Sequence, residues 1–283
     1  MAALSTTTSG RAWAPDESKF APDEVVPDAL ILTTSTVAGQ IEGDEPALRV
    51  AFVDDAAATF TAEGTTISES DPGLDEVLVY TGKITQLVKI TNEQWRQTET
   101  ALQLSDSVRR AIIKKANQAY LTQAAPTSPN VTPPAGLMNV TGIESGGAVA
   151  DDLDTLIDLI ATLEGNGGTP SHIVTDPVGW ASLRKFKTQT GAATSLLGAG
   201  TADATRQLLD LPVIVSSAMS TGTGLVLDTS AVVSAVGSVR IANSEHMFFN
   251  SDSVALRATW RIGWNLVHPD RIGKFTITAP AAA

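Results

Sequence analysis

The sequence contains no cysteine, which excludes disulfide bonds and thiolate metal sites within the chain. It is also short of positive charge, because 19 lysines and arginines stand against 31 aspartates and glutamates, a formal net charge of −12. A chain this acidic repels phosphate backbones, which disfavours broad, sequence-independent nucleic-acid binding. No run of about 18 apolar residues is present, so we expect no membrane-spanning helix. The N-terminus lacks the apolar core of a signal peptide.

Motifs for catalysis or cofactor binding are missing as well. The three histidines, His172, His246 and His268, stand in unrelated contexts without metal-ligand spacing. No G-x-S-x-G motif marks a nucleophilic serine. We therefore predict no enzyme, no cofactor and no metal site. A soluble hydrolase that pairs a serine with His172 or His246 is kept as a remote alternative.

The first 29 residues are polar and rich in Ser, Thr, Ala, Pro and Asp. Alone, such a segment cannot offset the entropy lost on ordering, so it is either disordered or an arm that lies on another surface. Trp13 and Phe20 favour the arm, because isolated aromatic residues in a polar segment usually dock. They are the candidate docking residues.

Two strands joined by a long acidic excursion follow. Residues 48–55 and 75–90 are dense in Val, Leu, Ile and Tyr, which is typical of strands. The turn signals Gly64 and Asp71-Pro72-Gly73 lie between them, too far apart for a tight hairpin. Between Glu42 and Glu76, Arg49 is the only basic residue among ten acidic ones.

A long helix is predicted next, over about residues 92–123. The stretch 91–125 contains neither Gly nor Pro, and Thr91 with Gln94 forms a capping-box pattern. The helix dipole favours the basic residues of its second half, which are Arg109, Arg110, Lys114 and Lys115. Such a helix would be roughly 45 Å long with a thin apolar stripe, as expected of a strut.

Four prolines between residues 126 and 134 mark a boundary, after which short helices and strands alternate up to about residue 248. The clearest element is an amphipathic helix over 151–163. Its apolar face would consist of Leu153, Leu156, Ile157, Ile160 and Leu163. This part of the chain is predicted to be a compact α+β unit.

The stretch 254–268 is a strand with two distinct faces. Val254, Leu256, Ala258, Trp260, Ile262, Trp264 and Leu266 share one face, and Arg257, Thr259, Arg261 and Asn265 share the other. A single-stranded nucleic-acid platform needs aromatic and basic side chains on the same surface. Because they are segregated here, we predict a core strand whose arginines meet carboxylates.

The order of these parts resembles the major capsid protein of tailed bacteriophages, an α+β fold of the HK-ninety-seven-like type. The resemblance covers most of residues 30–277. It rests on "PPAGLMNV", "DDLDTLIDLIATLEGNGGTPSHIVTDPVGWASLRKFK", "LLDLPVIVSSAM" and "VALRATWRIGWNLVHPDRIGKFTI", in that order.

The resemblance assigns a role to each part. Residues 1–32 would be the N-terminal arm, and 33–130 the first part of the P domain. That part would hold an E-loop at about 50–82 and a spine helix at about 92–123. Residues 131–248 would form the A domain, and 249–283 the P-domain return strand and the C-terminal tail.

The resemblance further implies an icosahedral head shell in the virion, built of pentamers and hexamers of this chain in the host cytoplasm. The shell would enclose double-stranded DNA without sequence-specific binding and without a membrane. Portal, scaffolding and decoration proteins are the other implied partners. No lysine precedes Lys83 in the E-loop, so we do not expect the covalent lysine–asparagine crosslinks of some family members. An encapsulin shell is the alternative, although residues 1–29 lack its usual N-terminal helix.

Charge segregation suggests how copies meet: an acidic E-loop lies on a neighbour's basic P-domain surface. The acidic candidates are Glu63, Glu69, Asp71, Asp75 and Glu76. The basic candidates are Arg109, Arg110, Lys114, Lys115, Arg257 and Arg261.

Overall fold

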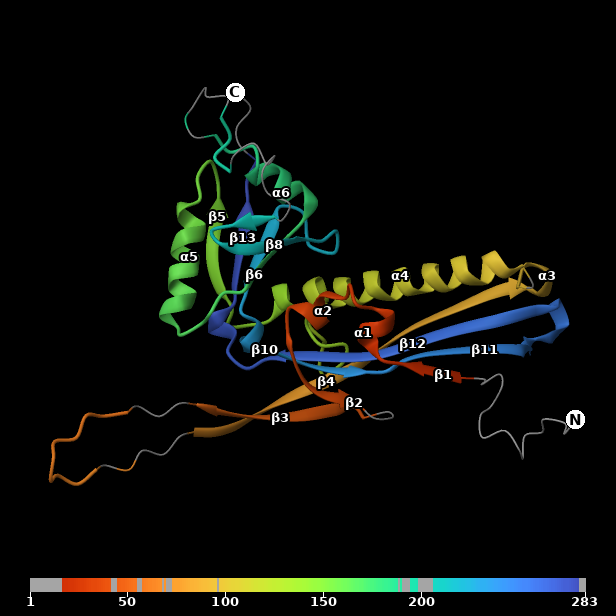
Figure 1. The fold of residues 1–283 in the computed structure, drawn as a ribbon, viewed down its shortest axis with the longest axis horizontal. Helices are drawn as coiled ribbons and strands as arrows, with labels where there is room; N and C mark the ends of the chain where they lie inside the picture. The colour runs from red at the N-terminus through yellow and green to blue at the C-terminus, as the bar shows by residue number, and fades with distance from the viewer. Residues whose placement is uncertain are drawn as a thin grey trace, which may run out of the picture.

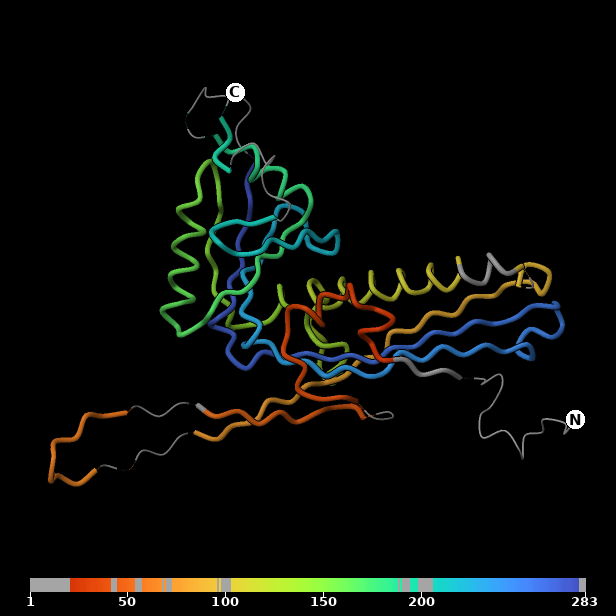
Figure 2. Tube along the Cα trace, viewed as in Figure 1, coloured from red at the N-terminus to blue at the C-terminus, as the bar shows by residue number. Residues whose placement is uncertain are grey.

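The computed structural model describes residues 17–41, 45–54, 58–67, 69, 73–95, 97–187, 189, 194–197 and 206–279, with only the backbone of 17–20, 54 and 98–102. The chain forms an L-shaped molecule (Figure 1). A long platform of strands and one helix forms one limb, and a compact unit rises near one end of it. A two-stranded hairpin projects beyond that end, as the trace in Figure 2 also shows.

A seven-stranded sheet forms the platform. Its main path runs β1 (Glu17–Phe20), β11 (Val239–Phe248), β12 (Ser253–Leu266), β10 (Val232–Gly237) and β2 (Thr36–Ile41). Two further strands, β4 (Gly73–Thr91) paired with β12 and β3 (Ala47–Asp54) paired with β4, complete it. Of these pairings only that of β2 with β10 is parallel.

Strand β12 is the core strand predicted from its alternation. All seven residues of the predicted apolar face are buried, and Trp260 is 1% exposed. The indole N–H of Trp260 donates to the Gly237 carbonyl at 2.9 Å, and that of Trp264 donates to the Ala135 carbonyl at 2.7 Å. Both tryptophans are therefore anchored inside the platform, as expected for buried rings with a polar group.

The predicted long helix is shorter than expected and is preceded by a break. Helix α4 spans Thr98–Thr122, about 37 Å, and a separate turn, α3, spans Asn92–Trp95. The interruption lies at Gln97, whose ψ of 116° is extended rather than helical. Val108, Ile112, Ala116 and Ala119 of α4 are buried in the core, whereas Ser105, which shares their helical spacing, is exposed.

Two short helices, α1 (Pro22–Val25) and α2 (Leu30–Thr33), hold the N-terminal part of the chain near α4. The backbone N–H of Leu30 donates to Asn117 of α4 at 2.9 Å. The Thr34 hydroxyl lies 3.1 Å from the buried Tyr120 hydroxyl, where burial raises the pKa of the tyrosine. Trp13 lies outside the described residues, and the backbone of Phe20 pairs with Val239 at the sheet edge.

The compact unit contains a six-stranded sheet and two helices. The sheet order is β5 (Glu144–Val149), β13 (Gly273–Ile277), β9 (Thr223–Leu227), β6 (His172–Thr175), β8 (Leu211–Val215) and β7 (Gln207–Leu208). The helices are α5 (Asp154–Gly165) and α6 (Pro177–Leu183). One-turn 3-10 helices occur at Leu137–Asn139, Thr229–Ala231, Phe249–Ser251 and Pro269–Arg271.

Two details of this unit differ from the sequence prediction. Ile157 is 47% exposed although it was placed on the apolar face of α5, because Leu156, Leu159 and Leu163 carry the buried stripe instead. The expected limits of 131–248 also differ from the strand pairing. Strands β10 and β11 belong to the platform, and β13, expected in the return segment, belongs to the compact unit.

Candidate assembly interface

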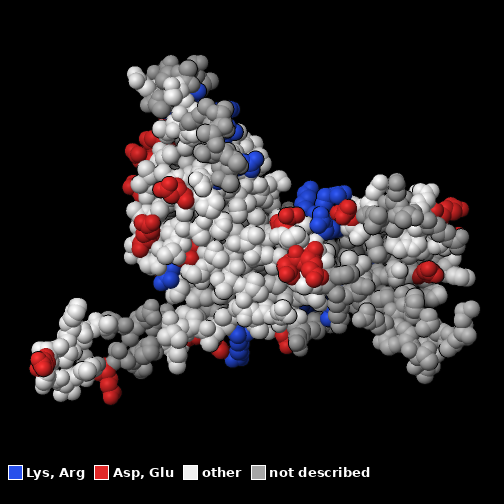
Figure 3. Space-filling view, in the orientation of Figure 1, with Lys and Arg blue, Asp and Glu red and all other residues white. Residues whose placement is uncertain are grey.

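The β3–β4 hairpin projects from the body of the molecule (Figures 1 and 3). Its strands pair in register from Ala47 opposite Tyr80 to Asp54 opposite Gly73. All ten residues of the described tip, 58–67, are exposed. The tip therefore makes no packing contact with its own subunit among the described residues, and it offers its whole surface to another molecule.

The acidic candidates lie along this hairpin. Glu63 and Glu69 are exposed at the tip, and no ion pair holds either of them within the described part of the chain. Asp75 and Glu76 lie in the tip-side half of the paired strands, opposite Phe52 and Ala51, and Glu76 forms an exposed ion pair with Arg49 at 3.1 Å. Asp71 lies outside the described residues.

Four of the basic candidates lie together on α4. Arg110, Lys114 and Lys115 are exposed, and Figure 3 shows basic side chains gathered over this helix. Arg109 is half-buried, and its buried Nε has no hydrogen-bond partner among the described residues. Arg110, Lys114 and Lys115 are therefore the cations of this set that a carboxylate of another molecule can reach most easily.

The other two basic candidates lie on a different surface. Because side chains alternate along β12, Arg257 and Arg261 project from the sheet face opposite the α4-packed residues Trp260 and Ile262. Arg261 also donates to Thr81 Oγ1 at 2.9 Å and to the Glu45 carbonyl at 3.4 Å, both in its own subunit. The six predicted cations therefore form two surfaces on opposite sides of the sheet.

Strand pairing adds three cations to the far surface that sequence analysis missed. Lys83 lies opposite Arg261, Lys89 opposite Ala255, and Arg240 opposite Thr259. Residues directly opposite one another share a sheet face, so all three lie on the same face as Arg257 and Arg261. No local signal marks them, since each lies on a different strand and only the register brings them together.

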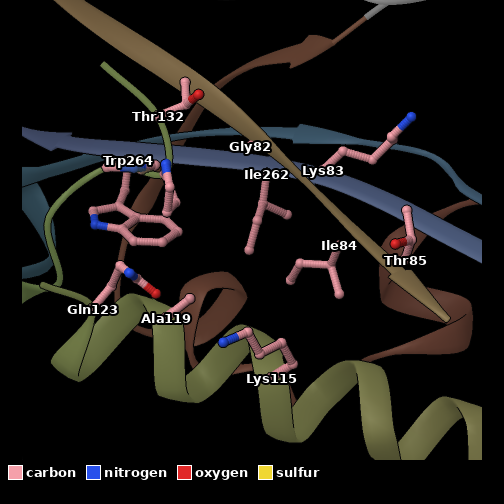
Figure 4. Close-up of a pocket in the computed structure, with 12 residues that line it drawn as sticks. Gly82, Lys83, Ile84, Thr85, Lys115, Ala119, Gln123, Thr132, Ile262 and Trp264 are labelled. Carbon is pink, nitrogen blue, oxygen red and sulfur yellow. The ribbon is translucent and has the colours of Figure 1, made fainter. Parts of the chain in front are cut away.

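A cavity of about 570 Å³ lies between the basic part of α4 and the sheet (Figure 4). The side chains of Ile84, Ile262 and Ala119 converge on it, and the ring of Trp264 forms one wall. Lys115 extends from α4 at its edge, whereas Lys83 points away from the helix. The segment Thr132–Pro134 also lines the cavity.

The hydrolase alternative receives no support from its histidines. His172 Nδ1 lies 3.0 Å from the hydroxyl of its neighbour Ser171, and burial lowers the pKa of the imidazole. That serine hydroxyl donates to the Leu227 carbonyl and lies 2.8 Å from Thr229 Oγ1, which fits a structural role at the end of β6. His246 is exposed on β11. Over the described ranges no cluster of metal-ligating side chains is present, and no helix is long and apolar enough to cross a membrane.

Comparison with known proteins identifies the fold. Chains of three solved structures superpose on nearly all of this one. The capsid of an empty GTA particle matches with a TM-score of 0.68 and 14% identity, over 99% of this chain and 96% of that chain. Microbacterium phage Oxtober96 matches with a TM-score of 0.68 and 14% identity, over 97% of this chain and 96% of that chain. Gordonia phage Cozz matches with a TM-score of 0.66 and 15% identity, over 98% of this chain and 92% of that chain. No curated protein sequence matches the chain. At these identities the similarity shows a shared fold, and the α+β HK-ninety-seven-like architecture predicted from the sequence is confirmed.

The family follows from the sequence itself. The model of the phage capsid family matches residues 32–277, most of the chain. The chain therefore belongs to the phage capsid family. It is a structural protein, a major capsid protein of the head shell, and the encapsulin and hydrolase alternatives are not favoured.

Proposed function

We propose that this chain assembles as pentamers and hexamers into an icosahedral shell that encloses phage double-stranded DNA, and that it catalyses no reaction. The observation that carries the proposal is the projecting β3–β4 hairpin, whose described tip is exposed throughout. The described tip residues 58–67 pack on nothing in their own subunit, and packing on a neighbouring subunit explains why they project. Portal, scaffolding and decoration proteins, and assembly in the host cytoplasm, belong to the same proposal.

In the proposed contact, the tip of the β3–β4 hairpin, which corresponds to the predicted E-loop, lies on α4 of the neighbouring subunit. Glu63 and Glu69 supply negative charge at the tip, and Arg109, Arg110 and Lys114 supply positive charge on the helix. Each exposed pair contributes only about 0–1 kcal/mol, but symmetry repeats the contact at every subunit of a closed shell. Arg261 on the far sheet face already donates to Thr81 and to the Glu45 carbonyl of its own subunit, which supports α4 as the receiving surface.

The test is a charge reversal on α4. Arg109→Glu with Arg110→Glu should abolish or strongly reduce shell formation, measured as the particle fraction in size-exclusion chromatography and electron microscopy. Arg109→Lys with Arg110→Lys keeps the charge and is the matched control, which should still give shells.

A charge swap makes the test specific. Adding Glu63→Lys and Glu69→Lys to the reversed helix should restore particles, since the attraction is rebuilt with opposite signs. Shells in normal yield from the double reversal alone would contradict the proposed contact.

A further inference from the structure

Phe60 is the most exposed large apolar residue described in this molecule. Its relative exposure is 109%, and it belongs to the exposed tip, residues 58–67. Burying a phenylalanine side chain stabilises a complex by about 1.5–3 kcal/mol relative to leaving it in water. An aromatic residue presented in this way, on a tip whose described residues 58–67 are all exposed, suits an anchor for a pocket on another molecule.

The cavity between α4 and the sheet has the chemistry to receive that anchor. Its inner surface is formed by Ile84, Ala119, Ile262 and Trp264, and its volume of about 570 Å³ accommodates a phenyl ring (Figure 4). The indole of Trp264 already packs edge-to-face with Tyr120 at 5.5 Å, so it presents a rigid wall rather than a mobile side chain.

Charge favours one orientation of a ring in this cavity. Glu63 follows Phe60 by three residues, and residues 58–67 contain no lysine or arginine. Lys115 is exposed at the cavity edge on α4. A ring seated between Ile84 and Trp264 therefore brings the Glu63 carboxylate toward the Lys115 ammonium.

The occupant is a second copy of this chain. Figure 1 shows the E-loop leading away from the platform, so the tip is far from the cavity of its own subunit. We propose that Phe60 of one subunit seats in the α4–sheet cavity of its neighbour, with Glu63 against Lys115. This inference rests on the proposed assembly and adds the specific anchor, its pocket and the face of the sheet that is used.

The absence of native cysteine permits a direct test by crosslinking. Thr61→Cys, next to the intact Phe60 and exposed at the tip, is combined with Thr132→Cys, an exposed residue on the cavity wall. Assembled particles are treated with a mild oxidant and run on a denaturing gel without reductant. We expect ladders of covalently linked subunits that collapse to monomer when reductant is added.

The matched control combines Thr61→Cys with Leu87→Cys, which is 51% exposed on the opposite face of β4. It should remain monomeric on the gel. Particles that crosslink only in the control, or equally in both, would overturn the inference and leave the proposed shell intact. A parent protein that never forms particles would overturn the proposed function itself.

A second pair of variants keeps the inference testable if the cysteine pairs do not assemble. Phe60→Leu retains an apolar anchor and should keep the particle yield within about twofold, whereas Phe60→Asp should lower it at least tenfold. Equal yields from the two variants would overturn the role of Phe60.

Discussion

Asp176 shows how one buried residue joins two distant segments of the compact unit. Its carboxylate is 2% exposed and accepts hydrogen bonds from the backbone N–H groups of Val178 and Gly179 at 2.9 and 3.0 Å, which caps α6. It also accepts from the N–H of Gly222, in the turn before β9, at 3.0 Å. Hydrogen bonds to a charged acceptor are the stronger kind, so this residue stabilises both the helix start and the turn.

Replacing Asp176 tests whether these hydrogen bonds stabilise the compact unit. Asp176→Ala leaves three backbone donors without their acceptor and should lower the free energy of unfolding by about 2–4 kcal/mol. Asp176→Asn keeps one acceptor oxygen and should lose less. Denaturant unfolding of the unassembled protein gives the values, with the exposed Asp158→Ala of α5 as control. Equal losses in Asp176→Ala and the control would show that the network contributes nothing.

The same residue shows what sequence can and cannot predict at this scale. Proline at the first position of a helix and aspartate just before it are both common, so the contacts of Asp176 with α6 follow from neighbours in the chain. The contact with Gly222 depends on how β6 and β9 pair, and no local pattern encodes it. For the same reason, sequence analysis did not place Lys83, Lys89 and Arg240 on the same sheet face as Arg257.

At the scale of elements, β4 connects the E-loop to the platform. Its first half pairs with β3, and its second half pairs with β12 from Thr81 to Thr91. Gly263 of β12 lies where the two pairings meet, and a Cβ there would come within 2.3 Å of the Tyr80 carbonyl oxygen. The E-loop is thus a continuation of the platform sheet and not a separate loop.

Removing this element should separate folding from assembly. Replacing residues 56–71 with a short Gly/Ser turn leaves the pairing of 47–54 with 73–80 in place. We expect the melting temperature of the unassembled protein to change by no more than a few degrees, because no described tip residue packs on the body. Particle formation should be lost. Shells of normal diameter from the shortened chain would contradict the role of the E-loop.

Elements were predicted where their signal is local. Strands expected at 48–55 and 75–90 are found at 47–54 and 73–91, since alternation and composition act over a few residues. The helix expected at 92–123 is divided into the turn α3 at Asn92–Trp95 and the helix α4 from Thr98, because Gln97 between them is extended. Strands β10 and β11 fall within the predicted unit 131–248 but pair with β12 of the platform. Tertiary packing sets this pairing, and no local pattern encodes it.

The whole molecule combines an acidic surface with a basic patch that symmetry can repeat. With a net charge of −12, copies repel one another at long range, and in the proposed contact attraction arises where the hairpin tip meets α4 of a neighbour. Exposed charge pairs are screened over about 8–10 Å at physiological salt, which is why we propose that the apolar anchor Phe60 holds the contact. Assembly is then a balance between weak charge pairs, one buried ring and the closure of the shell.

Electron microscopy of the purified protein in negative stain, over a range of protein and salt concentrations, tests the central claim most directly. We predict closed polyhedral particles of uniform diameter, whose yield rises with protein concentration. Small oligomers of fixed size at every concentration and ionic strength would contradict self-assembly into a shell.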